Sequence, residues 1–177
     1  MLLKRMVTGR LQEVLNFWFG VPGSANYLKS KSFWYGSKED DELVRRKLGK
    51  DYEDARKGKL DEWSDNVEGG LALIILLDQV PRNIFRDKAQ AYETDSKALA
   101  VLKKIVANGW DKDQPTIIRR YIYSPYNHSE NFADQEQSVK LFAQLGDPMH
   151  MYWAKRHYDI IKQHGRFPHR DLAMNRR

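Results

Sequence analysis

The sequence predicts an all-α fold, made of antiparallel helical hairpins in one domain of about seven helices that spans residues 1–177. Apolar residues recur every three or four positions along successive segments, as they do on the buried face of a helix. No segment shows the alternation of polar and apolar residues that is typical of a paired strand. Glycines and prolines separate the periodic segments at short intervals, and short connections favour antiparallel neighbours.

The first two helices have recognisable ends. Leu11 and Trp18 lie on one face of the first helix, and Gly20 stops it. A turn-rich loop follows, in which Trp34 and Tyr35 are expected to anchor to the body of the protein. Ser37 can cap the second helix, which has only a sparse apolar stripe. The predicted spans of these two helices are about 9–19 and 38–57.

The third helix, over about residues 67–79, is expected to be buried. Residues 71–77 are all apolar, and a helix that is hydrophobic on every side belongs in the core. Pro81 is predicted to interrupt this helix, because proline removes a backbone donor and clashes with the preceding turn.

Four more helices are predicted in the C-terminal half. Thr94 or Asp95 can cap the first of them. Pro125 is expected to limit the second, and Ser129 or Asn131 can cap the third. The predicted spans are about 95–108, 115–123, from the cap at 129 or 131 to 145, and 148–163.

Composition excludes several classes of protein. The chain contains no cysteine, which rules out disulfides, thiolate catalysis and cysteine-based metal centres. Its apolar runs are too short to cross a membrane, and its N-terminus lacks the apolar segment of a signal peptide. We therefore expect a soluble, cytoplasmic protein that does not bind membranes. The net charge of +6 is mostly C-terminal, but the pattern lacks an RNA-binding signature, so nucleic acid is an unlikely partner.

Three polar segments carry the candidate functional residues. The apolar run 71–77 ends abruptly in DQVPRNIFR at 78–86, and SPYNHSE at 124–130 and GRFPHR at 165–170 have a similar character. Polar groups next to a core need partners, which suggests that the segments share a buried polar centre. The candidate ligand-binding residues are Asp78, Gln79, Arg82, Asn83, Arg86, His128, Glu130, Arg166, His169 and Arg170.

Each segment allows a structural and a functional interpretation. Asp78 could hold Arg82 or Arg86 in a geometry suited to carboxylate or phosphate, or these residues could brace the turn at the helix end. His128 and Glu130 could form an acid–base pair, or Glu130 could belong to the acidic first turn of the next helix. His128, Glu130 and His169 are therefore the candidate catalytic residues.

The histidines of the last helix do not predict a metal site. His150, His157 and His164 are seven residues apart, whereas metal-binding pairs on a helix are usually four apart. The Glu-x-x-His pattern of di-metal helical bundles is missing as well. No phosphate-binding or dinucleotide-binding motif is present, and we expect neither a metal nor a cofactor.

Several motifs together resemble one known family. NFWFG at 16–20, DQVPRNIFR at 78–86, AYETD at 91–95, SPYNHSE at 124–130 with Gln135, and HYDIIKQHGRFPHR at 157–170 resemble the family called domain of unknown function 924. The resemblance covers about residues 11–171. It implies an all-helical fold of the tetratricopeptide-like superfamily, and it implies no particular reaction. One departure is Asp171, where the family usually has Asn.

Two functions of different classes are consistent with these patterns. The first is a polar cleft that binds an anionic or polar small molecule, since Arg82, Arg86, Arg166 and Arg170 would repel one another unless an anion or water completed the site. The alternative is a tetratricopeptide-like adaptor that binds a peptide or protein. Convergence of the three segments would favour the cleft. Arginines that are each matched to an internal carboxylate would favour the adaptor.

Overall fold

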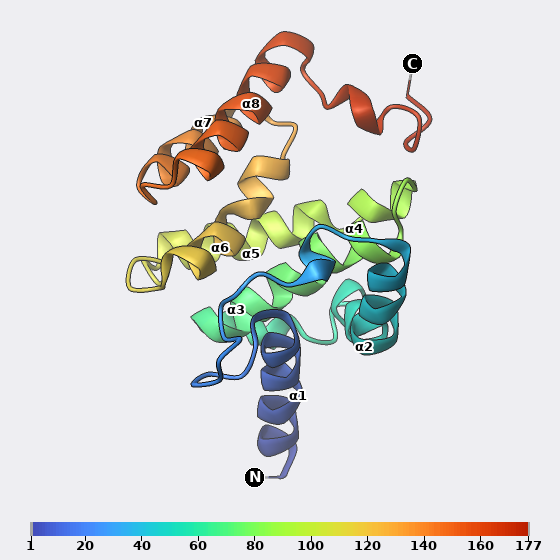
Figure 1. Ribbon diagram of the computed structural model, residues 1–177, viewed down its shortest axis with the longest axis vertical. Coiled ribbons are helices and arrows are strands. Elements are labelled where there is room, and N and C mark those ends of the chain that lie inside the picture. Colours follow the sequence, from blue (N-terminus) through green and yellow to red (C-terminus); the bar gives the residue numbers. More distant parts are fainter. Residues whose placement is uncertain (1, 177) are drawn as a thin grey trace.

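The computed structural model describes residues 2–176, with side chains from Gly9 onward. All regular secondary structure in this range is helical, as Figure 1 shows, and the prediction of an all-α fold is confirmed. Helices α3, η3 and α4 form one continuous segment, so the described residues contain the predicted seven long helical segments. They are α1 (Leu2–Phe19), α2 (Lys38–Arg56), α3 (Val67–Ile74) with η3 (Ile75–Gln79) and α4 (Val80–Ile84), α5 (Asp95–Ala107), α6 (Thr116–His128), α7 (Phe132–Ala143) and α8 (Pro148–His164).

Side-chain caps begin several of these helices. Ser37 accepts a hydrogen bond from the backbone of Asp40, as predicted. Of the two candidate caps for α7, Asn131 is the one used, since it accepts from the backbone N–H groups of Ala133 and Asp134. Gly165 ends α8 with a positive φ of 66°, a conformation that glycine adopts without steric cost.

Two prolines lie inside helical segments. The prediction that Pro125 limits α6 is wrong, and Pro81 follows an interruption of the α-helical hydrogen bonding that does not end the helical segment. The backbone of η3 widens into a π-helical turn, in which the N–H of Val80 bonds to the carbonyl of Ile75, and Pro81 then lies in the first turn of α4. Each proline deprives the carbonyl four residues earlier of its usual donor. In each case a side-chain hydroxyl lies next to the carbonyl that lacks its backbone N–H donor. Thr94 Oγ1 donates to Leu77 O at 2.5 Å, and Ser124 Oγ lies 2.8 Å from Tyr121 O.

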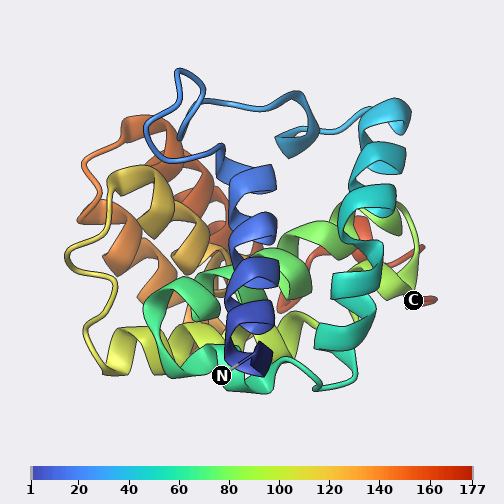
Figure 2. The same ribbon diagram turned by 90° about the horizontal axis from the view of Figure 1, so that it is seen from below.

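The α3–η3 segment forms the middle of the core. Residues 71–77 are at most 5% exposed, as their apolar run predicts, and they belong to one continuous hydrophobic cluster with residues of α1, α2, α5 and α6. In Figures 1 and 2, α7 and α8 lie side by side on the opposite side of the molecule from α2. No helix of the described residues is long and apolar enough to cross a membrane.

The loop between α1 and α2 is anchored by one of the two predicted aromatic residues. The indole N–H of Trp34 donates to the carbonyl of Trp18 at 3.1 Å, and its ring packs edge-on against Tyr121 at 5.2 Å between centroids. Tyr35 does not anchor the loop, because it is 66% exposed. The loop therefore holds Trp34 against Tyr121 of α6.

Candidate functional site

Asp78 is the centre of a polar network at the end of the buried helix. The residue lies in the π-helical turn and is 0% exposed. Its carboxylate lies 2.8 Å from His128 Nδ1, 2.9 Å from Ser124 Oγ and 2.7 Å from Gln79 Nε2, which donates to it. Burial alone raises the pKa of Asp78, but the neighbouring side chains of His128 and Arg82 outweigh that effect and lower the pKa well below its usual range.

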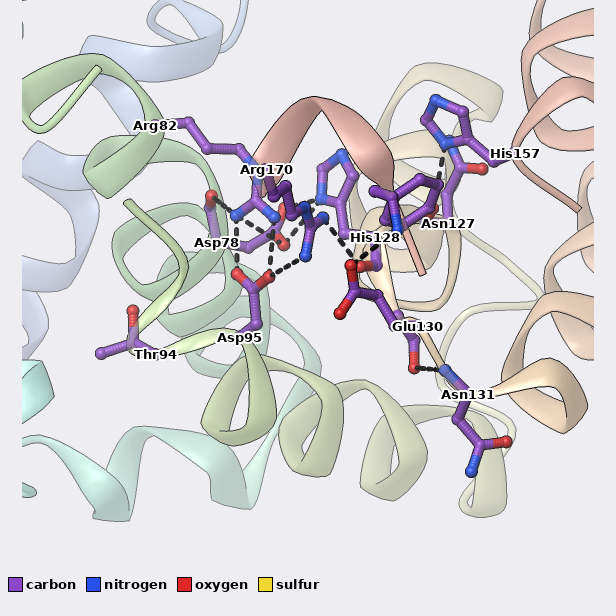
Figure 3. Close-up of polar contacts among 12 residues, drawn as sticks. Asp78, Arg82, Thr94, Asp95, Asn127, His128, Glu130, Asn131, His157 and Arg170 are labelled. Atoms are coloured by element: carbon purple, nitrogen blue, oxygen red, sulfur yellow. Dashed lines mark hydrogen bonds and ion pairs between the residues drawn. The ribbon is translucent and has the colours of Figure 1, made fainter. Parts of the chain in front are cut away.

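A second carboxylate connects the network to the C-terminal segment. Arg82 donates two hydrogen bonds to Asp95, at 2.7 and 2.9 Å, and one to the backbone carbonyl of Asp78 at 2.6 Å. Arg170, only 5% exposed, donates to Asp95 at 3.4 Å and to the carbonyl of His128 at 2.9 Å. The three polar segments therefore meet in one place, as Figure 3 shows.

Neighbouring groups hold the end of α6 in position. The side chain of Gln135, which is fully buried, donates to the carbonyls of Tyr126, Asn127 and Ser129 at 2.7–3.2 Å. Tyr126 and Asn127 belong to the last turn of α6 and Ser129 follows it, so these carbonyls lie where the helix no longer supplies its regular donors. The same turn is held from α8, where Nδ1 of His157 lies 2.9 Å from the carbonyl of Asn127.

His157 is electrically neutral at physiological pH. Burial is the largest cause of its shift, and the nearby His128 adds to it, lowering the pKa of His157 to about 4. A neutral ring carries one proton, and the carbonyl of Asn127 places that proton on Nδ1. The Nε2 atom of His157 is therefore a hydrogen-bond acceptor.

Two of the candidate residues brace the fold by contacts with α2 and the loop before it. Arg86 forms a two-pronged ion pair with Asp41 of α2, at 2.7 and 2.8 Å. Asn83 donates to the same carboxylate at 2.9 Å and to the carbonyl of Phe33 at 3.0 Å. These contacts connect α4 to α2 and to η1 (Ser32–Trp34), and they are separate from the Asp78 network.

The C-terminal candidates form a further cluster. Glu130 accepts from Arg176 at 2.6 Å and from the backbone N–H of Phe167 at 2.8 Å, so the carboxylate partner of His128 is Asp78 and not Glu130. Arg166 forms an ion pair with Asp171 at 3.0 Å. Asp171 is the residue that replaces the usual Asn of the family, and Arg166 is its partner. The side chain of His169 is exposed to solvent.

One argument for an anion is wrong. Arg82, Arg86, Arg166 and Arg170 each have a carboxylate within 4 Å, and only Arg82 and Arg170 share one, that of Asp95. The four arginines are thus not an uncompensated group that needs a bound anion.

A pocket of about 320 Å³ opens beside the network. Its lining is basic, aromatic and amide-bearing and contains no carboxylate. The lining residues are Trp34, Tyr35, Gln79, Arg82, Asn83, Arg86, Arg120, Tyr121, Ser124, Asn127, His128, Phe142, His150, Trp153 and His157. A smaller pocket of about 260 Å³ adjoins it, shares Arg82, Arg86, His128 and His157, and extends to His169 and Arg170.

Arg120 is one of the lining residues that the sequence analysis did not name as candidates. No carboxylate lies within ion-pair distance of it among residues 9–176, and its guanidinium lies 5.1 Å from the ring of Tyr121. A signal was present in the sequence: Arg120, Ser124 and His128 are four residues apart and therefore share one face of α6. Within the described part of the chain, no group of three His, Cys, Asp or Glu side chains is placed to hold a metal ion.

Comparisons with known proteins place the chain in a family. The model of the family described as "Bacterial protein of unknown function (DUF924)" matches residues 14–177. The chain is also similar to the solved structure of the protein of unknown function ATU0120 from Agrobacterium tumefaciens. The identity is 28%, the TM-score is 0.85, and the match covers 97% of this chain and 93% of the other. A search of curated proteins finds no match. Since the family model spans nearly the whole sequence, this chain belongs to the DUF924 family of bacterial proteins.

Proposed function

We propose that the protein binds an organic anion in the larger pocket, with Arg120 as the main contact for its charge. The observation that carries this proposal is the lining: three arginines and three histidines face the pocket, and no carboxylate does. Arg82 and Arg86 are already paired with carboxylates behind the pocket wall. Arg120 is the arginine of the lining whose charge has no counter-ion among the described side chains, and guanidinium is well suited to carboxylate or phosphate.

The aromatic part of the lining suggests what else the ligand contains. Trp34, Tyr121 and Trp153 border the pocket together with the arginines. Aromatic rings bury apolar or flat groups favourably, and ligand sites commonly combine such surfaces with a few polar groups. We therefore infer an anion that carries an apolar or aromatic portion.

The tetratricopeptide-like adaptor is the weaker proposal. The pairing of four candidate arginines with carboxylates favours it. Convergence of the three polar segments on Asp78 favours the pocket, because an adaptor's recognition residues are expected to spread along an exposed face. The basic lining around Arg120 is our reason for preferring the pocket, since it supports an anion site without relying on the paired arginines.

The test is a titration of the protein with inorganic phosphate and with phenyl phosphate. Tryptophan fluorescence and calorimetry measure the binding. Trp34 and Trp153 line the pocket and should report binding. We expect phenyl phosphate to bind more tightly than phosphate. Arg120→Met should weaken binding of both by about ten-fold or more, as expected for loss of a charge-assisted hydrogen bond.

The matched control is Arg46→Met, which removes one positive charge from an exposed position on α2, away from the pocket lining. It should leave both affinities nearly unchanged. Equal affinities for the wild type and Arg120→Met, or the absence of any heat and fluorescence change with either probe, would contradict the proposal.

A further inference from the structure

We propose that His128 is the proton acceptor of an acid–base site in the larger pocket, and that Asp78 is its positioning residue. The substrate class is an organic anion whose hydroxyl group, or an adjacent water molecule, reaches Nε2 of His128 while its charge lies against Arg120. This inference rests on the proposed anion site and assigns it a chemical role.

The contact with Asp78 determines which nitrogen of His128 is available. Nδ1 lies 2.8 and 3.0 Å from the two carboxylate oxygens of Asp78, which can only accept hydrogen bonds while ionised. In the neutral ring the proton is therefore on Nδ1, and Nε2 carries the free electron pair. A histidine oriented by a buried carboxylate is the arrangement that activates such a base in many hydrolytic enzymes.

The free nitrogen has access to the pocket. The side chain of His128 is 20% exposed, and it lines both adjoining pockets. In Figure 3 its second ring nitrogen points away from Asp78, on the same side as the free nitrogen of His157. No side chain or backbone group among the described residues forms a hydrogen bond with Nε2 of His128.

The surroundings hold Asp78 and His128 rigidly. Asp78 is fully buried and has contacts with Gln79, Ser124 and Arg82 as well as with His128. The backbone carbonyl of His128 accepts from Arg170. Because both members of the pair are fixed, the ring cannot rotate freely, which is the preorganisation that proton transfer requires.

The spacing along α6 gives the size of the substrate. Arg120 and His128 are eight residues apart on one helix face, which places their Cα atoms about 12 Å apart. The side chains of Trp34, Tyr121 and Trp153 border the same pocket. A substrate that contacts both ends therefore has an apolar or aromatic segment between its charge and its reacting group.

The proposed step is a single proton transfer. The O–H bond of the hydroxyl group or water breaks, its proton binds to Nε2 of His128, and the electron pair stays on oxygen, which becomes a nucleophile. The imidazolium that forms is stabilised by the carboxylate of Asp78, 2.8 Å away on the other side of the ring.

The first experiment measures how reactive His128 is. Diethyl pyrocarbonate acylates unprotonated histidine, and peptide mass spectrometry can follow each histidine separately at pH 7.5. We expect His128 to react at least as fast as the exposed His164 on the same chain, which is the internal control. Phenyl phosphate should protect His128 and leave His164 unaffected. An unreactive His128 beside a normally reactive His164 would overturn the proposal.

The second experiment tests the role of Asp78 by a readout other than stability. Nitrogen-15 NMR should show the Nδ1–H form of His128 in the wild-type protein. In Asp78→Asn the amide can donate to Nδ1, so the proton should move to Nε2 and the acylation rate should fall about ten-fold. Since the wild-type spectrum alone decides the tautomer, an Nε2–H form in that spectrum would refute the proposal even if Asp78→Asn fails to fold.

Arg120→Met separates this inference from the proposed function. It should abolish the protection of His128 by phenyl phosphate, whereas the control Arg46→Met should keep both that protection and the acylation rate of His128. In the wild type, His128 could react rapidly without protection by phenyl phosphate. That result would contradict the anion site and the substrate class inferred here, but it would still support a reactive His128. An inert His128 in a protein that binds phenyl phosphate would refute the acid–base role alone.

Discussion

Two clusters of arginine and carboxylate lie close together in this molecule and differ in burial more than in geometry. Around Asp78 and Asp95, the side chains of Asp78 and Arg170 are 0% and 6% exposed, and those of Arg82 and Asp95 are 21% and 20% exposed. In the C-terminal cluster, formed by Glu130, Arg166, Asp171 and Arg176, the two arginines are 42% and 25% exposed. Short contacts occur in both, with 2.7 Å between Arg82 and Asp95 and 2.6 Å between Arg176 and Glu130.

The comparison teaches that contact distance alone does not rank these ion pairs. Exposed pairs usually contribute about 0–1 kcal/mol, because water and salt screen them and two long side chains lose freedom. Removing one partner of a buried pair typically costs about 3–5 kcal/mol, because it leaves a charge without compensation. The Asp78 network should therefore be essential for stability, while the C-terminal cluster mainly fixes the position of its segment.

The largest expected effect is that of Asp78→Ala. It leaves Arg82, His128 and the hydroxyl of Ser124 without their buried partner, so the free energy of unfolding should fall by about 2–4 kcal/mol. Urea unfolding measures this loss, and the melting temperature should fall with it. Asp171→Ala in the C-terminal cluster is the control, with a loss below about 1 kcal/mol. An unchanged melting temperature for Asp78→Ala would remove the distinction between the clusters.

Arg170→Met should lower the free energy of unfolding by about 2 kcal/mol. The change removes the donor to the carbonyl of His128, and Asp95 keeps Arg82 as its partner. Arg166→Met makes the same chemical change in the exposed cluster and should cost less than about 1 kcal/mol. Equal losses in the two variants, measured by urea unfolding, would show that burial is not the deciding factor.

Acid should weaken the buried region through His157. Its pKa is about 4 in the folded protein and about 6.5 in the unfolded chain, so between these values the unfolded chain binds more protons. The stability that depends on neutral His157 is complete well above pH 6.5 and is lost as the pH falls towards 4, with a loss of about 2 kcal/mol at pH 5. Urea unfolding of His157→Gln across this range should show a shallower pH dependence, whereas the exposed His164→Gln should match the wild type.

The smallest effect should come from the pair between Glu130 and Arg176. A double-mutant cycle with alanine at both positions should give a coupling energy below about 1 kcal/mol, and 0.5 M salt should reduce it further. A coupling energy above 2 kcal/mol would place this pair in the same class as the buried network.

The helices could be predicted because their signals are local. Apolar spacing and the caps at Ser37 and Asn131 act within a few residues. The behaviour of the two prolines could not be predicted from local signals alone. Pro81 is accommodated by a π-helical turn, and the carbonyl of Leu77 accepts from the hydroxyl of Thr94, seventeen residues away. Only the folded chain brings that donor into place.

The candidate site was predictable in outline and not in its pairings. Polar residues at the end of a buried helix must find partners, which explains why residues of the three segments meet near Asp78. The choice between Glu130 and Asp78 as partner of His128 depends on the packing of α6 against η3, fifty residues apart in sequence. Arg120 was missed because it precedes the polar segment by a full helical turn, although its spacing from His128 indicated a shared face.

The π-helical turn makes the chain sensitive to length at one point. A π turn contains one residue more than an α turn over the same stretch of helix. It is therefore equivalent to an α-helix into which one residue has been inserted. Deleting one residue between Ile75 and Leu77 would restore an α-helical repeat and keep the two flanking helices in phase, whereas inserting one more residue would rotate the residues before it by about 100° relative to those after it. Asp78 and the apolar residues of α3 could then no longer keep their present directions together. We therefore expect a one-residue insertion at this turn to be tolerated far less well than a one-residue deletion there, or than either change in the loop between α1 and α2.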